Sequence, residues 1–334
     1  MPLDPAGVVL QLHLAPHELI ERVTPQPDLF VVAHLGLPQV DVATWRLEIG
    51  GLIERPRTFS FDEIRQLPKH SVESFHQCAG SPFRADIAVR RVANVVWSGA
   101  DLGDLLGAAG IKPEARYLVS HGLDPDENAG VVAAHYVKDI PIERLMQGGL
   151  LLAYEINGEP LTREHGSPLR LMIPGYYGTN AVKWLCRLEL TAERPSGVFT
   201  SELYNDPVAP GSGLDGTSTR PVWEAGPEAI IVAPGDGSTL GRQATEIFGW
   251  AWAANGVERV EISADDGLTW LLTELEPRAQ WSWQRFSMQW HPSASGSHRL
   301  MARATDARGS TQPLELARNS VHTVQVEIAP SSAN

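Results

Sequence analysis

The spacing of apolar and polar residues predicts a first half of short strands joined by turns and a few short helices. Residues 61–67 have helical spacing and stop at Pro68, and Ser60 is placed to cap this helix at its N-terminus. A second helix is expected after a turn at residues 98–101, and a third is expected to enter at Pro141. Strands are predicted at residues 45–51, 92–97, 117–120, 150–156, 169–173 and 181–185.

The composition changes after residue 205, where proline, glycine, serine and threonine become frequent up to residue 228. Such a stretch is typical of a linker. Seven short strands with turns between them follow it, and this pattern is typical of an immunoglobulin-like sandwich. They are expected at residues 229–233, 244–253, 257–263, 270–275, 281–290, 298–305 and 321–328. The predicted fold class is α+β, with a mixed α/β domain over 1–205, a linker over 206–227 and an immunoglobulin-like β-sandwich over 228–330.

The size and charge of the chain narrow the classes of partner. A chain of 334 residues exceeds the usual size of one hydrophobic core, which agrees with two domains. Its 40 acidic and 27 basic residues leave a net charge of −13, so nucleic acid and anionic membrane surfaces are poor partners. No apolar run approaches the roughly 18 residues that span a bilayer. The first residues lack a secretory signal pattern, so we expect a cytoplasmic protein, or a periplasmic one whose export signal was removed.

Cys78 is the first candidate for chemistry. It ends an alternating run in which His76 projects from the same side, and a Gly-Ser-Pro turn follows. A thiol in that position can act as a metal ligand or a nucleophile, or it can be a small buried core residue. The second cysteine, Cys186, lies in an apolar segment and is expected to be a plain core residue.

Arg170 and Lys183 are the second candidate. They flank a glycine-rich loop, so they are either two solvated charges or a cationic pocket for a phosphate. Seven of the ten tryptophans follow residue 220, which indicates dense packing or a protein interface in the C-terminal part.

Several motifs, in order along nearly the whole chain, resemble the sulfite oxidase family of molybdopterin enzymes. The matching pieces are Phe30-Val31 with His34, Gln77-Cys78-Ala79-Gly80, Trp97 with Gly99, Gly122-Leu123-Asp124, Leu151 to Glu155 with Asn157 to Leu161, His165-Gly166 with Pro168-Leu169-Arg170, Pro174-Gly175, Val182 to Leu185, and Arg303 to Asp306.

The resemblance implies a Mo-molybdopterin cofactor with Cys78 as the protein ligand to molybdenum. It implies that the pterin and its phosphate are held by His165, Arg170 and Lys183, and that Phe30, His34, Asp124 and the Ala181–Val182 backbone line the same cavity. Tyr204 matches the active-site tyrosine. The implied activity is oxygen-atom transfer on a small-molecule substrate, with electrons exchanged through an external protein partner. The C-terminal domain is implied to form a homodimer.

The chain departs from the family on the substrate side. Ser81-Pro82-Phe83 stands where sulfite oxidases have Asn-Arg-Arg, and Val32-Ala33 replaces an upstream arginine. Since a small dianion needs cationic partners, a substrate other than sulfite is expected. The alternatives are a sulfoxide or N-oxide reductase, a true sulfite oxidase in which Arg84 compensates, and a family relic that acts as a binding protein. Arg90 and Arg91 are further candidates for compensation.

Overall fold

The computed structural model of the protein describes residues 8–11, 14–80, 91–124, 127–128, 131–133, 135–207, 219–314 and 318–330. These residues form two compact units. The first unit takes the segments Met1–Leu12, Phe30–Val72 and Val96–Glu224, and the second takes His13–Leu29, Glu73–Val95 and Ala225–Asn334. Two segments of the predicted first domain, including the one with Cys78, therefore belong to the C-terminal unit.

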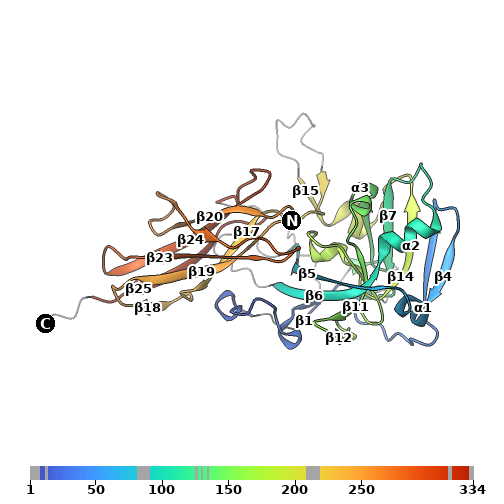
Figure 1. Ribbon diagram of the computed structural model, residues 1–334, viewed down its shortest axis with the longest axis horizontal. Helices are drawn as coiled ribbons and strands as arrows, with labels where there is room; N and C mark the ends of the chain where they lie inside the picture. Colours follow the sequence, from blue (N-terminus) through green and yellow to red (C-terminus); the bar gives the residue numbers. More distant parts are fainter. Residues whose placement is uncertain are drawn as a thin grey trace. The chain divides into compact units, whose positions relative to one another are not determined.

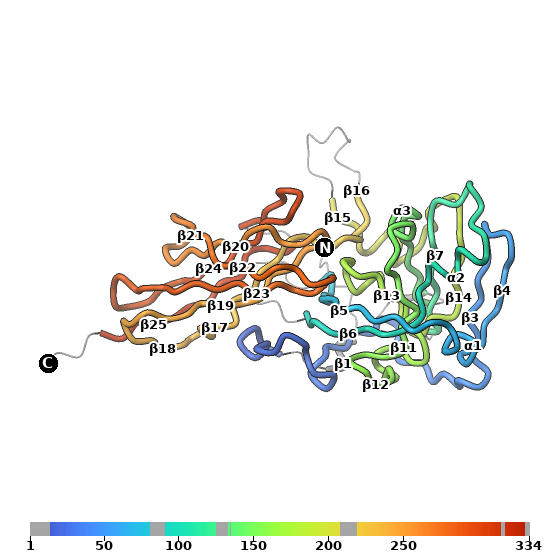
Figure 2. The backbone as a smooth tube through the Cα atoms, viewed as in Figure 1, coloured from blue at the N-terminus to red at the C-terminus, as the bar shows by residue number. Residues whose placement is uncertain are grey.

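The first unit is built on two five-stranded sheets. Figure 2 shows the strands β3, β14 and β7 of one sheet side by side. That sheet has the order β10-β7-β14-β3-β4. The other has the order β12-β11-β6-β5, with β13 paired to β11. Strands β5 and β6 contribute residues to both units. The strands are β1 (Val8–Gln11), β2 (Val31–Ala33), β3 (Arg46–Gly51), β4 (Arg57–Ser60), β5 (Lys69–Gln77), β6 (Val92–Asp101), β7 (Tyr117–Gly122), β8 (Glu127–Asn128), β9 (Val131–Val132), β10 (Val137–Pro141), β11 (Leu151–Ile156), β12 (Glu159–Pro160), β13 (Arg170–Met172), β14 (Leu185–Thr191), β15 (Asn205–Pro207) and β16 (Thr219–Pro221).

The helices of the first unit are short and begin where the sequence supplies caps. Helix α1 (Phe61–Arg65) begins at Ser60, whose hydroxyl accepts from the Glu63 N–H while the Glu63 carboxylate accepts from the Ser60 N–H. This confirms the predicted N-cap. Helix α2 (Leu102–Ala109) is capped by Asp101, whose carboxylate accepts from the Asp104 N–H. The first unit also contains α3 (Ile142–Met146) and the short turns η3 (Gly178–Asn180) and η4 (Val198–Glu202), whereas the turns η1 (Pro16–Glu18) and η2 (Gln26–Asp28) belong to the second unit.

The second unit contains a sandwich of two sheets (Figure 1). One sheet has the order β17-β19-β23-β22 and the other β18-β25-β24-β20-β21. Alternate residues of both sheets point inward and form one apolar core that includes Phe286, Leu300 and Val324. The strands are β17 (Glu228–Ala233), β18 (Ser238–Leu240), β19 (Thr245–Trp252), β20 (Val257–Ser263), β21 (Leu271–Leu272), β22 (Glu274–Leu275), β23 (Gln284–Trp290), β24 (Gly296–Asp306) and β25 (His322–Ile328).

Three predicted elements differ from the structure. The turn expected at residues 98–101 is the end of β6, because Gly99 lets β11 come close: a Cβ there would lie 2.0 Å from the Leu152 carbonyl oxygen. The strand expected at 181–185 begins only at Leu185. The strand expected at 270–275 is divided between the two sheets at Thr273, which bonds to Val260 O through its N–H and its hydroxyl.

The expected fold class is matched in part. The described residues form mostly strands, with α-helices of 5, 8 and 5 residues, so the mixed α/β character predicted for the first domain overstates the helix content. No helix in this part of the chain is both long and apolar enough to cross a membrane.

Candidate functional site

A cluster of basic side chains lies in the first unit where a turn, the start of β13 and the segment before β14 meet. Arg170 is buried, with its Nη1 3.4 Å from His165 O and its guanidinium 5.0 Å from the centre of the Trp97 ring. Lys183 is half-buried and donates to Glu164 O at 2.9 Å. The structure therefore brings together three residues that the sequence assigned to the pterin and its phosphate.

Burial disfavours the positive charge of each side chain in this cluster, and Arg170 adds to the effect on His165 and Lys183. Burial, with Arg170 and Lys183 nearby, lowers the pKa of the His165 imidazole to about 4. Burial lowers the pKa of Arg170 to about 9, and burial together with Arg170 lowers the pKa of Lys183. Buried positive charges gathered in this way are stabilised when an anion binds among them.

One ring nitrogen of His165 is open for a hydrogen bond to a ligand. Its Nδ1 lies 2.9 Å from the Thr162 hydroxyl, whereas its buried Nε2 has no hydrogen-bond partner among the described residues. The next residue, Gly166, has φ +106°, and a Cβ there would lie 2.9 Å from Lys183 Cβ. Glycine is therefore required for the close approach of the turn to Lys183.

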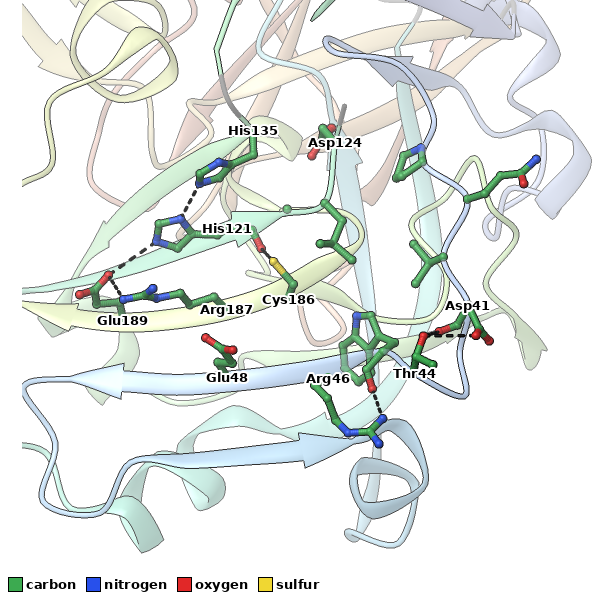
Figure 3. A pocket seen from close by; sticks show the side chains of 16 residues that line it. Asp41, Thr44, Arg46, Glu48, His121, Asp124, His135, Cys186, Arg187 and Glu189 are labelled. Atoms are coloured by element: carbon green, nitrogen blue, oxygen red, sulfur yellow. Dashed lines mark hydrogen bonds and ion pairs between the residues drawn. The ribbon is translucent and has the colours of Figure 1, made fainter. Parts of the chain in front are cut away.

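Asp124 is buried at the edge of the same region. Burial raises the pKa of its carboxyl, although the nearby Lys183 opposes that shift, and its Oδ2 has no hydrogen-bond partner in the part of the chain described. Asp124 also lines a cavity of about 840 Å³ with residues from 38–48, 121–124 and 186–189 (Figure 3). A buried carboxyl with an open acceptor suits a ligand that carries N–H donors.

The cavity also contains a row of polar side chains that the sequence did not reveal. His121 Nδ1 lies 3.0 Å from His135 Nε2, and His121 Nε2 lies 3.9 Å from the Glu189 carboxylate (Figure 3). Burial and the neighbouring His135 lower the pKa of His121 to about 4, so His121 is neutral at neutral pH. Cys186 lines the cavity too and donates to His121 O, so it is half-buried rather than the plain core residue that was expected. Burial raises the pKa of its thiol to about 11, which keeps it unreactive.

His34 and Tyr204, 170 positions apart, form a buried pair with 2.5 Å between His34 Nε2 and the phenol oxygen. The rings of Tyr136 and Phe199 pack against His34, and Lys138 Nζ lies 5.3 Å from the Tyr204 ring centre. Tyr204 has φ +56°, a left-handed conformation that is costly for a bulky residue. Such strain is typical of functional positions.

Cys78 follows β5 directly and is half-buried within the second unit. Its Sγ accepts from the Gly80 N–H at 3.5 Å, and Arg91 Nη1 lies 3.8 Å from it. Arg91 is fixed by a second bond to Gly80 O at 3.2 Å. A thiolate is stabilised by such donors, so this turn favours a cysteine that acts as a ligand.

The positions of the other predicted residues do not indicate a role in cofactor binding. Phe30 is half-buried, and Ala181 and Val182 are buried. The Ala181 N–H donates to Gly178 O and the Val182 carbonyl accepts from Leu171 N, so these two groups already have backbone partners. Arg84, like Ser81, Pro82, Phe83 and Arg90, lies outside the described residues.

These residues fit a molybdopterin. The buried basic cluster with the open His165 Nε2 suits a phosphate, and the open Asp124 oxygen suits the amino and amide groups of a pterin. The fold and the site thus define a protein built to hold an anionic, nitrogen-rich cofactor.

Comparisons with known proteins identify the class. Residues 34–199 match the oxidoreductase molybdopterin binding domain, and residues 220–326 match the Mo-co oxidoreductase dimerisation domain. Rat mitochondrial sulfite oxidase is 31% identical over 94% of this chain, and the chain covers 64% of the length of that relative. Sulfite oxidase of Arabidopsis thaliana is 30% identical over 87% of this chain and 82% of its own. Among solved structures, the sulfane dehydrogenase SoxCD from Paracoccus pantotrophus superposes with a TM-score of 0.77 at 27% identity, covering 94% of this chain and 85% of that one.

The chain therefore belongs to the sulfite oxidase family of molybdopterin-dependent oxidoreductases.

Proposed function

We propose that this chain is an oxidoreductase that moves an oxygen atom to or from a small substrate and exchanges electrons with an external redox protein. The basic cluster of His165, Arg170 and Lys183 carries the proposal, because these side chains are gathered in the interior, His165 Nε2 has no hydrogen-bond partner among the described residues, and burial lowers the pKa of each group. A bound anion would stabilise their charged forms. When bound, a molybdenum–pterin cofactor supplies two-electron oxygen-atom transfer. Cys78 would supply a thiolate ligand to the metal.

Each remaining residue has a role that follows from its contacts. Arg170 and Lys183 would pair with the phosphate of the cofactor, and His165 Nε2 would donate a hydrogen bond to it. Asp124 accepts hydrogen bonds from the pterin. Tyr204, held by His34 at 2.5 Å, holds a proton next to the substrate.

We propose a reduced sulfur compound less charged than sulfite as the substrate. Val32 and Ala33 supply no cation, and each charge-assisted contact is worth about 1.5–3 kcal/mol. Val32-Ala33 replaces one arginine of the family and Ser81-Pro82-Phe83 replaces another, and two missing contacts weaken sulfite handling by roughly two to four orders of magnitude. The similarity to a sulfane dehydrogenase supports a substrate that carries a sulfane sulfur.

Sulfite itself is the second candidate, and Arg91 favours it. The Arg91 guanidinium lies 3.8 Å from Cys78 Sγ, which places one cation beside the proposed metal ligand.

Steady-state oxidation with an artificial one-electron acceptor distinguishes the two substrates. We expect poor sulfite turnover by the wild-type protein and improvement when Val32→Arg and Phe83→Arg are combined. Robust wild-type oxidation with a micromolar KM, lost in Arg91→Met, would contradict the first substrate and support the second. Substrates that carry a sulfane sulfur are measured in the same assay.

We also propose that the C-terminal sandwich is an immunoglobulin-like module that makes the protein a homodimer. The match of residues 220–326 to a dimerisation domain supports this proposal. A cytoplasmic location remains part of the proposal, with the periplasm as the alternative.

A further inference from the structure

Strand β5 ends just before Cys78, and its last residues are bonded through the backbone to the segment before β23 in the same unit. Phe75 N–H donates to Trp281 O at 3.1 Å, and Trp281 N–H donates to Glu73 O at 3.1 Å. Glu73 N–H also donates to Gln280 Oε1 at 2.6 Å. These bonds fix the strand a few residues before the cysteine.

Gln77, the residue immediately before Cys78, is completely buried in a polar network. Its amide nitrogen donates to the carboxyl of Glu228, the first residue of β17. Its amide oxygen accepts from Trp252 Nε1 at 2.9 Å, at the end of β19. Because both ends of the amide are bonded, Gln77 has one allowed orientation.

The residue after Cys78 is held from another part of the same unit. The Arg318 guanidinium, on the segment that leads to β25, donates to Ala79 O. The Cys78 N–H itself donates to Arg91 O at 2.9 Å. Both neighbours of the cysteine are thus fixed by residues that lie more than a hundred positions further along the chain.

Stability alone does not account for this network. Glu228 and Gln77 are each fully buried, and replacing buried polar groups by packed apolar residues is commonly neutral or stabilising. Outer partners that orient a metal ligand, by contrast, change metal affinity or activity by about 10- to 100-fold when they are removed.

We propose that Glu228, Trp252 and Arg318 position the Cys78 thiolate for molybdenum, so that the C-terminal domain belongs to the catalytic apparatus as well as to the dimer. This inference rests on the proposed function, in which Cys78 is the metal ligand. The three residues are positioning residues, since they act through Gln77 and Ala79.

The test uses the full-length holoenzyme with matched tryptophan variants. Trp252→Phe keeps a ring but removes the N–H that holds Gln77. Trp250→Phe and Trp283→Phe are the controls, because these buried tryptophans donate to Leu19 O at 2.6 Å and Arg22 O at 2.9 Å and have no bond to Gln77. Glu228→Leu removes the carboxyl, whereas Glu228→Gln keeps an oxygen that can accept from Gln77.

The readouts are the Mo(V) EPR spectrum after titration with dithionite, the midpoint potential, and retention of molybdenum during dialysis. We expect Trp252→Phe and Glu228→Leu to shift the spectrum and potential and to retain the cofactor about 10- to 100-fold less well. Trp250→Phe, Trp283→Phe and Glu228→Gln are expected to match the wild-type protein. In cofactor-free chains, iodoacetamide is expected to alkylate Cys78 faster in Trp252→Phe than in Trp250→Phe.

The outcomes separate this inference from the proposed function. Wild-type protein that contains no molybdenum overturns both. Wild-type protein that contains molybdenum, with Trp252→Phe indistinguishable from Trp250→Phe in spectrum, potential and alkylation rate, overturns the positioning role alone. If Glu228→Leu does not fold, the tryptophan variants decide.

Discussion

Replacing Arg170 by methionine is expected to stabilise the cofactor-free protein while weakening cofactor binding. The guanidinium is buried, and burial lowers its pKa from 12.5 to about 9. Methionine fills a similar volume, remains against Trp97 and carries no charge. The substitution therefore removes a charge that is unfavourable in the empty site and favourable in the occupied one.

The magnitude follows from three contributions. The lowered pKa corresponds to a cost of about 5 kcal/mol for keeping the charge at neutral pH. Against this, the substitution loses a cation–π contact with Trp97, worth about 2 kcal/mol when desolvated, and a long hydrogen bond to His165 O, worth about 1 kcal/mol. The free energy of unfolding of the cofactor-free protein should therefore rise by about 2 kcal/mol. A lost charge-assisted contact to phosphate should weaken cofactor binding by about 1.5–3 kcal/mol.

The assay is urea unfolding of full-length protein from a host that cannot make the molybdenum cofactor, together with pterin release from protein made in a normal host. Arg144→Met is the matched control. Arg144 is equally buried, donates to Gly148 O and Pro174 O at 2.9 and 3.0 Å, and lies over the Tyr176 ring. Its loss should destabilise the fold and leave the pterin content of the folded protein unchanged.

The reasoning is refuted if Arg170→Met contains wild-type amounts of pterin. It is also refuted if the cofactor-free variant loses several kcal/mol of stability, as Arg144→Met is expected to do.

Three further predictions concern acid stability, the second cysteine and assembly. His322 Nδ1 accepts from Ile231 N–H at 3.3 Å, and burial lowers its pKa from 6.5 to about 4. The neutral imidazole therefore contributes about 3 kcal/mol to the free energy of unfolding above pH 6.5, and this contribution is lost as the pH falls to about 4. In urea unfolding, His322→Gln should flatten the dependence of stability on pH between these values, and an unchanged dependence would contradict the prediction. Cys186→Ala should cost about 1 kcal/mol without changing molybdenum content or turnover, and lost turnover would show that the thiol takes part. Light scattering of the full chain at micromolar concentration should give the mass of a dimer, and a monomer would contradict the proposed role of residues 220–326.

Local signals predicted most of the elements because they act within a few residues. The Ser60 cap, the alternation from residue 45 to 51 and the alternating strand at 257–263 each depend on near neighbours, and α1, β3 and β20 lie there. The division of residues 270–275 between two sheets depends on Thr273 meeting Val260, a contact between strands that periodicity does not encode.

The site was predicted through motifs rather than through geometry. Sequence named His165, Arg170 and Lys183 as candidates, but it did not show that they lie together in the interior, where burial lowers the pKa of each. It offered Arg91 only as a further candidate for a compensating cation, and the structure places the Arg91 guanidinium 3.8 Å from Cys78 Sγ. The sequence did not indicate a role for Glu228, since a glutamate after a linker is usually exposed. Its burial against Gln77 in the structure indicates that role.

The central claim is that Cys78 binds molybdenum held by a pterin, and metal analysis tests it most directly. Wild-type protein grown with molybdate should contain about one molybdenum and one pterin per chain. Cys78→Ser should keep the fold and lose the sulfur ligand from the molybdenum X-ray absorption spectrum, together with turnover. Wild-type protein without molybdenum, or a Cys78→Ser variant with an unchanged spectrum and full turnover, would contradict the account.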